Sequence, residues 1–195
     1  DDIDCFMPRS DYEKFPALWE KYGDKDRFVF CRSNEEVNFH HSCSSLRDPS
    51  TTFICSYNQN LDICHGVALE FAPIDGCPNS KIKQYIQLFH AFNYALFNTQ
   101  RLPNNKGGFF RIAAKVIYKL VPSPHVRYLL WRHAEKQMSK YKWEDCDNVR
   151  ECIGSIKGMM WVHPKEWFSS HKVRTLYRNG SRVVCVCRLP ATRSE

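Results

Sequence analysis

Three consecutive segments of helical length, each with its apolar residues on one side, occupy the middle of this 195-residue chain. The longest runs from Ser80 to Thr99, with the three- and four-residue spacing of an amphipathic helix. Its apolar residues are Ile82, Tyr85, Ile86, Phe89, Phe92, Leu96 and Phe97. Lys83, Gln84 and Gln87 fall on the opposite side. We therefore expect this helix to form the centre of the core.

Two more amphipathic helices are predicted directly after it. The first extends from Phe109 to Val121, and Pro122-Ser123-Pro124 ends it. Ser123 is a favourable cap for the next helix, which begins with Pro124 in its first turn and continues to Tyr141. The inward-facing residues of the second of these helices are Val126, Leu130, Ala134, Met138 and Tyr141.

Strand-like patterns flank the helices on both sides. Thr51 to Tyr57 and Ile63 to Phe71 are separated by Asn58-Gln59-Asn60, which predicts a pair of strands in the N-terminal region. Near the other end, Asn179-Gly180 separates two β-rich runs and predicts a hairpin with a two-residue turn. In that hairpin Leu176 would lie opposite Val183.

These elements together predict an α+β fold. Its central amphipathic helices would be flanked by the N-terminal strand pair and the C-terminal β-hairpin. The length fits a single domain over residues 1–195. It would comprise an acidic N-terminal region (residues 1–75), a basic helical region (residues 76–142) and a C-terminal helix and hairpin (residues 143–195). No apolar run approaches the roughly eighteen residues that a membrane span needs.

Charge is sorted along the chain. The net charge is −7 over residues 1–75, +11 over 76–142 and +3 over 143–195. Six of the basic residues recur every four positions on the second and third helices, so each helix would carry a ridge of positive charge. They are Arg111, Lys115, Lys119, Arg132, Lys136 and Lys140. Glu135 is the only acidic residue between Arg101 and Lys142, whereas exposed helices ordinarily interleave both signs.

This imbalance indicates an anionic partner. The leading interpretation is a binding domain that recognises an acidic protein surface or a sulfated glycan through the basic helices. Leu129 interrupts the second ridge and would supply an apolar contact, which favours a protein surface. The rival interpretation is internal, because the acidic N-terminal region would also neutralise the ridges by docking on them. The sequence indicates no cofactor and no oligomeric state.

Cysteine usage bears on the compartment. The ten cysteines permit five disulfides and favour a secreted or luminal protein stapled by them. They are Cys5, Cys31, Cys43, Cys55, Cys64, Cys77, Cys146, Cys152, Cys185 and Cys187. Asn179-Gly180-Ser181 is an N-glycosylation acceptor, and the start at Asp1 is typical of a processed chain. We expect an extracellular or luminal location, a glycan on Asn179 and no bound metal.

A zinc site is the competing account of the cysteines. Cys31, His40, His41 and Cys43 are close in sequence, as are Cys55, Cys64 and His65, and zinc accepts both ligand types. No pair has the Cys-x2-Cys or His-x3-His spacing of a standard zinc motif. Combined with the basic ridges, such a site would indicate a nucleic-acid-binding protein. This is the second function hypothesis.

An enzyme is the third hypothesis. The chain contains no nucleophile elbow, phosphate loop, His-Glu-x2-His or deaminase motif. The run from Cys55-Ser-Tyr to Cys64-His resembles a cysteine-bounded stretch that precedes the catalytic domain of luminal O-GlcNAc transferases acting on EGF repeats. The resemblance implies a fragment of a luminal glycosyltransferase-like enzyme. No catalytic residue is assigned.

Overall fold

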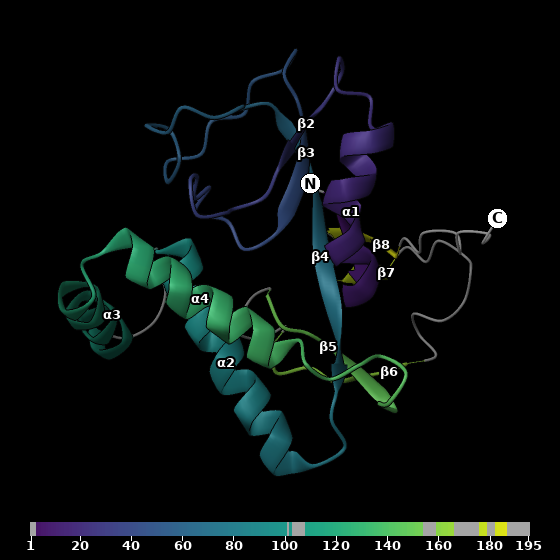
Figure 1. Cartoon of the computed structure of the whole chain (residues 1–195), viewed down its shortest axis with the longest axis vertical. Helices are drawn as coiled ribbons and strands as arrows, with labels where there is room; N and C mark the ends of the chain where they lie inside the picture. Colours follow the sequence, from purple (N-terminus) through teal and green to yellow (C-terminus); the bar gives the residue numbers. More distant parts are fainter. Residues whose placement is uncertain are drawn as a thin grey trace.

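The computed structural model describes residues 3–100, 102, 108–153, 159–165, 176–178 and 182–186. It has the expected α+β composition (Figure 1). The helices are α1 (Arg9–Tyr22), α2 (Lys81–Thr99), α3 (Gly108–Leu120) and α4 (Pro124–Met138). The strands are β1 (Ile3–Pro8), β2 (Val29–Cys31), β3 (Ser44–Asp48), β4 (Val67–Cys77), β5 (Asn148–Glu151), β6 (His163–Pro164), β7 (Leu176–Arg178) and β8 (Arg182–Val186).

Strand β4 is the centre of the sheet. The sheet follows the order β2-β3-β4-β1-β8-β7, and β5 pairs with the far end of β4. The pairing of β4 with β3 and β5 is antiparallel, whereas β1 runs parallel to both β4 and β8. Successive residues of a strand point to opposite faces, so β4 supports two separate cores. Phe71 packs on the α1 side, and Ala72 packs with α2 and α4.

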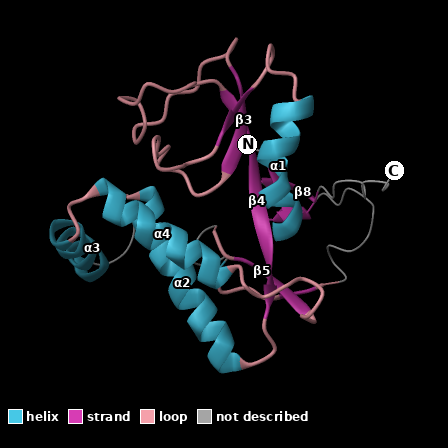
Figure 2. Cartoon of the chain, viewed as in Figure 1, coloured by secondary structure: helices cyan, strands magenta, loops and turns pink. Residues whose placement is uncertain are grey.

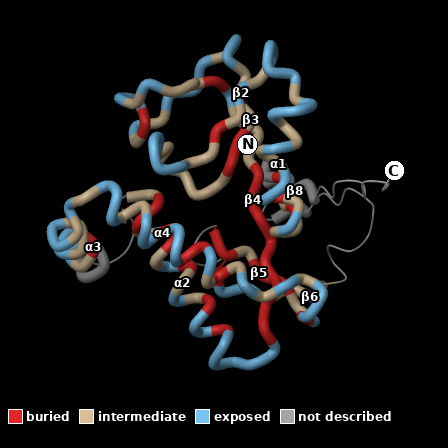
Figure 3. Tube along the Cα trace, in the orientation of Figure 1, coloured by how far each residue is buried: buried red, intermediate tan, exposed pale blue. Residues whose placement is uncertain are grey.

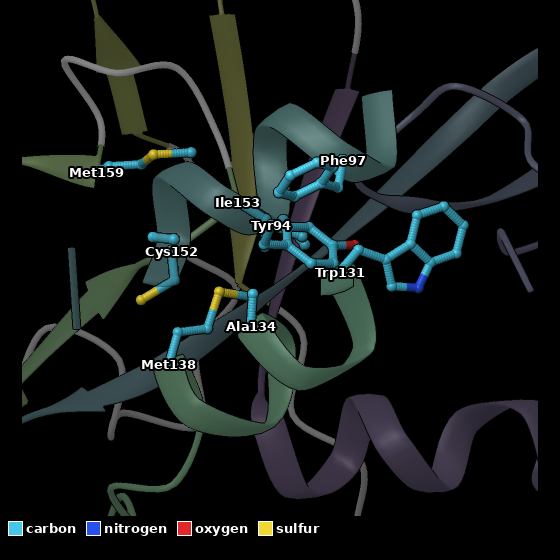
Figure 4. Close-up of a cluster of buried hydrophobic side chains, with 10 residues drawn as sticks. Tyr94, Phe97, Trp131, Ala134, Met138, Cys152, Ile153 and Met159 are labelled. Carbon is cyan, nitrogen blue, oxygen red and sulfur yellow. The ribbon is translucent and has the colours of Figure 1, made fainter. Parts of the chain in front are cut away.

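The larger core lies between α2, α4 and the segment after β5. Trp131 and Met138 of α4 are almost completely buried there, together with Tyr94 and Phe97 of α2 (Figure 4). Cys152, Ile153 and Met159 close the cluster from the C-terminal region of the chain. Helices α2 and α4 therefore form one packed layer, which Figure 1 shows on the side of β4 away from α1.

The helix predictions are confirmed in position. Ser80 precedes α2, and α4 begins after Ser123, whose hydroxyl accepts a hydrogen bond from the Val126 amide at 3.3 Å. Proline at the first position of α4 has no amide hydrogen to lose and has a helical φ already. The residues that mark the beginnings of α2 and α4 act within their own segments, so the predicted starts do not depend on the rest of the fold.

The first half of α2 buries the face opposite to the one we predicted, whereas Leu96 and Phe97 near its end pack in or against the core as predicted. Helix α2 carries buried and exposed residues in alternation (Figure 3). Gln84 and Gln87 are buried, whereas the predicted core residues Ile82, Tyr85 and Phe89 are largely exposed. The Gln87 side-chain amide donates to the Gly76 carbonyl at 2.8 Å and to the Met138 carbonyl at 2.9 Å. Both carbonyls lie at ends of elements, where the regular ladder leaves acceptors without partners. The glutamine supplies these donors, so the polar side of α2 turns inward.

The N-terminal strand pair exists, but between other residues than we predicted. It consists of β3 and β4, while residues 52–66 form loops and turns (Figure 2). The asparagines explain the difference: the Asn58 amide donates to the Cys55 carbonyl, and the Leu61 amide to the Asn58 carbonyl. Because these residues form consecutive turns, they do not adopt the extended conformation that the strands of a hairpin require. One hydrogen bond of the predicted pair remains, from Phe53 to His65.

The C-terminal hairpin is present with a shifted register. Leu176 pairs with Val184 and Arg178 with Arg182, so three residues separate the paired strands. The prediction of Leu176 opposite Val183, with a two-residue turn, is therefore wrong by one position. The turn itself, including Asn179, lies outside the described residues. Within residues 143–195 the structure adds β5 and β6, which the sequence analysis did not predict.

The predicted disulfide stapling has no support in the described residues. Cys31, Cys55, Cys64, Cys77, Cys146 and Cys152 are free thiols there. Burial raises the pKa of Cys31 to about 11, and it raises the pKa of Cys77, Cys146 and Cys152 as well. Of Cys185 only the backbone is described, and Cys187 lies outside the described residues.

A network of charged side chains joins the two layers. The Arg9 guanidinium donates two hydrogen bonds to Asp75, at 2.7 and 2.8 Å, and a third to Glu135 at 3.2 Å. Arg32 reaches the same Glu135 oxygen at 3.3 Å and also bonds to Glu13. Burial raises the pKa of the Asp75 carboxyl, and the paired Arg9 charge opposes that effect. Ion pairs of Arg9 thereby link α1 to both β4 and α4.

Replacing Asp75 by Asn tests this point. We expect the substitution to lower the free energy of unfolding by about 3 kcal/mol, because it leaves the buried Arg9 charge with a weaker partner. Chemical denaturation followed by circular dichroism measures the loss. The exposed Lys25–Glu20 pair supplies the control, since Lys25→Gln should cost less than about 1 kcal/mol. Equal losses in both variants would contradict the assigned role of Asp75.

A second pair of variants tests the reversed face of α2. Phe97 is 7 % exposed and Phe89 is 63 % exposed. Phe97→Ala should lower the free energy of unfolding by about 3 kcal/mol through loss of core packing. Phe89→Ala should change it by less than about 1 kcal/mol. Thermal and denaturant unfolding of both variants provide the measurement, and a larger loss for Phe89→Ala would mean that the part of α2 carrying Phe89 packs in the core.

Candidate protein-interaction surface

All six cations of the predicted ridges lie on exposed faces. Arg111, Lys115 and Lys119 project from α3, Lys136 projects from α4, and Lys140 lies two residues beyond the end of α4. Arg132 is also exposed, and it pairs with Glu135 of its own helix. Leu129 stands beside them with 51 % of its surface exposed. The structure therefore places every residue that we singled out for partner binding where a partner can reach it.

In the described part of the chain, the acidic N-terminal region makes no ion pair with these ridges. Among the described residues, no carboxylate between residues 3 and 75 forms an ion pair with any of the six cations. The ion pairs between the two regions have the opposite polarity: Arg9 and Arg32 of the N-terminal region supply the cations, and Glu135 of α4 supplies the anion. Glu35 does reach α4, where it bonds to His125 at 2.9 Å. The internal explanation of the basic ridges thus finds no contact in the described structure.

Helix α2 exposes a row of large apolar side chains. They are Ile82, Tyr85, Ile86, Phe89 and Phe92, all on the face turned away from the core. Neighbours three and four positions apart on a helix lie on the same side, so these five form one stripe. Single exposed apolar residues are common, but contiguous apolar stripes of this kind mark binding sites. The spacing of these residues predicted the stripe, but we expected it to face the core.

Helix α3 carries an apolar row directly beside its cationic row. Ile112, Val116 and Leu120 are exposed, and each follows a cation of the ridge by one position. Ala114, on the opposite side, is buried. We predicted that the apolar side of this helix faces inward, but the structure covers only a portion of it. The helix therefore offers positive charge and apolar area side by side.

Histidines connect the apolar row of α2 to α4. The rings of Phe89 and His90 lie 5.5 Å apart, and His90 contacts His133 of α4 at 6.0 Å. Burial lowers the pKa of His90, and the charges of His133 and Lys140 lower it further. The lowered pKa favours the neutral form of His90, which adds no charge between the two rows. We call the exposed apolar and basic residues of α2, α3 and α4 the helical surface.

Two chemical components characterise the helical surface. The cations attract an anionic partner over a distance that depends on the ionic strength of the solution. The apolar rows contribute favourable binding free energy only when a partner removes their surface from water. Within the described residues no helix is both long enough and apolar enough to span a bilayer. Comparison of the chain with protein-family models, with curated protein sequences and with solved structures finds no match.

Proposed function

We propose that this domain is a binding module for an acidic protein surface and that the helical surface is its binding site. The observation that carries the proposal is the exposure of apolar rows on α2 and α3 beside exposed cations. A partner that fits this arrangement presents carboxylates around an apolar strip. Such a partner covers the apolar rows and supplies the anions that the helices themselves lack.

The apolar rows favour a protein over a purely anionic polymer. A sulfated glycan gains from the six cations but makes little use of Ile82 or Leu120, which are more than 70 % exposed. Nucleic acid would stack its bases on exposed aromatic rings, and α2 offers Tyr85, Phe89 and Phe92. Neither polymer explains the aliphatic row on α3. A protein partner accounts for both the charge and the apolar area.

Titration with labelled probes tests the proposal. The probes are a synthetic helical peptide with Glu on one side and Leu on the other, the same peptide with Ser for Leu, a heparin oligosaccharide and a single-stranded oligonucleotide. We expect the Glu/Leu peptide to bind most tightly. Joint replacement of Arg132, Lys136 and Lys140 by Gln should weaken its binding and reduce the dependence of binding on salt, because fewer charges are neutralised.

A matched pair of apolar variants separates the two components. Phe89→Ser should weaken peptide binding without changing its salt dependence. Phe53→Ser is the control, since Phe53 has 59 % of its surface exposed, close to that of Phe89, but lies in the loop after β3. Equal effects of both variants would contradict the proposal. Tightest binding to heparin or to the oligonucleotide, unaffected by Phe89→Ser, would replace it with a polyanion-binding function.

The secreted or luminal location belongs to the same proposal. It is supported by the ten cysteines and by two neighbouring pairs, since Cys64 contributes to the raised pKa of Cys31 and Cys77 to that of Cys146. In an oxidising compartment thiols that lie near one another can form a bridge.

Intact mass before and after reduction tests the location. Protein isolated without reductant from its own cells should gain two hydrogens per bridge on reduction. Peptide mapping should assign bridges to Cys31 with Cys64 and to Cys77 with Cys146. The same protein should carry a glycan on Asn179, which a glycosidase removes. Ten alkylatable thiols and an unmodified Asn179 in the freshly isolated protein would contradict a secreted or luminal origin.

A further inference from the structure

A histidine, a cysteine and a glutamate meet on the face of the sheet opposite α1. The ligand atoms of His41, Cys43 and Glu70 all lie within 4.8 Å of one another. Two of these residues are separated by one position in the segment before β3, and Glu70 comes from β4. The sequence indicated His41 and Cys43 as candidate zinc ligands but missed Glu70, because only the strand pairing brings it near.

Strand register explains why these residues converge. Ser45 of β3 pairs with Glu70, and Cys43 lies two positions before Ser45. Residues two apart in an extended segment point to the same side. Ser44, between them, points the other way and bonds to Tyr12 of α1 at 2.7 Å. Cys43 and Glu70 therefore share the face that carries the cluster.

The segment is held in place from its other side. The Ser42 hydroxyl donates to the Ile153 carbonyl at 2.8 Å, and the Tyr94 hydroxyl donates to the Ser42 carbonyl at 2.8 Å. His40 has a φ of 54°, in the left-handed region that costs a residue other than glycine about 1 kcal/mol or more. That turn is stabilised by the Asn38 side chain, which accepts from the His40 amide at 2.8 Å. The strained turn directs His41 back toward Glu70.

The histidine is oriented as a metal ligand. Its Nδ1 lies 3.4 Å from the Cys43 carbonyl, which can only accept a hydrogen bond, so Nδ1 carries the proton. Ligating histidines are commonly fixed in this way by a backbone carbonyl. The Nε2 atom then faces the Glu70 carboxylate at 3.2 Å. Two acceptors at this distance need a cation between them, either a proton or a metal ion.

The third group favours a metal ion. The Cys43 sulfur lies within 4.8 Å of both the His41 nitrogen and the Glu70 oxygen, and Zn²⁺ binds nitrogen, sulfur and oxygen ligands together. Bond lengths to Zn²⁺ of about 2.0 to 2.3 Å place tetrahedral ligand atoms roughly 3.3 to 3.8 Å apart. The 3.2 Å separation of His41 and Glu70 is already near that value. The sulfur needs to move by only about 1 Å to complete it.

We propose that His41, Cys43 and Glu70 bind one zinc ion, with a fourth position for water or an external ligand. All three residues are partly exposed, so an ion can enter from solvent. His41 also stacks on Tyr57 of the neighbouring loop, with ring centres 6.4 Å apart. The site lies on the sheet and uses no residue of the helical surface.

Cobalt substitution tests the site directly. The whole chain is reduced, stripped with a chelator and titrated with Co²⁺, then with Zn²⁺. We expect one Co²⁺ per chain, with the visible bands of a tetrahedral ion and a sulfur-to-cobalt charge-transfer band in the near ultraviolet. Zn²⁺ should abolish both. Native mass spectrometry should show one zinc per chain that a chelator removes.

Variants separate the proposed ligands from other thiols and imidazoles. His41→Ala, Cys43→Ser and Glu70→Gln should each weaken binding by at least about tenfold. Cys55→Ser and His65→Ala, outside the cluster, should leave it unchanged. Loss of the charge-transfer band only in Cys43→Ser identifies that sulfur. Should Cys43→Ser fail to fold, Glu70→Gln tests the same site from the neighbouring strand.

Two outcomes would overturn the proposal. Without a charge-transfer band in the unmodified chain, His41 and Glu70 form an ordinary ion pair. Equal weakening by Cys55→Ser or His65→Ala would place the metal elsewhere in the chain. Neither outcome affects the helical surface, whose peptide binding is measured without metal.

Discussion

The largely buried guanidinium of Arg9 makes the interaction on which the arrangement of the layers depends. Arg9 begins α1, binds Asp75 near the end of β4 and reaches Glu135 of α4. Each carboxylate is buried, so neither is tolerated without a cation. Burying ions contributes little net stability compared with apolar groups of the same size, but removing one member of such a set is costly. The network therefore fixes which faces of β4 and α4 meet.

The position of α2 follows from this arrangement. Once α4 is held against β4, the carbonyls of Gly76 and Met138 both point at α2, and Gln87 satisfies them. Gln84 does the same for the Pro78 carbonyl. An apolar side of α2 in that place would leave these acceptors unpaired, at about 1 to 3 kcal/mol each. The exposed apolar row is thus a consequence of hydrogen bonding at the ends of neighbouring elements.

This explains how far the sequence could predict the fold and the candidate surface. Periodicity and capping located α2, α3 and α4, because those signals act within one segment. The face that α2 buries depends on carbonyls from β4 and α4, which no local pattern contains. The basic ridges were visible as spacing, and their exposure is as expected. Glu70 could not be identified from the sequence, because the pairing of β3 with β4 across the long intervening loop brings it near His41 and Cys43.

The topology of β1 has a consequence for how the chain folds. Its two neighbours are β4 and β8, so the first strand is completed by residues near 183–186. Arg9 and Glu135 are likewise 126 positions apart. Contacts of such long separation form after a large loss of chain entropy, and domains rich in them fold slowly. The contacts between α2 and α4 join residues that are closer in sequence than these, so the two helices can pack together earlier. Strand β1 therefore gains its second neighbour only after the chain has been synthesised beyond residue 186.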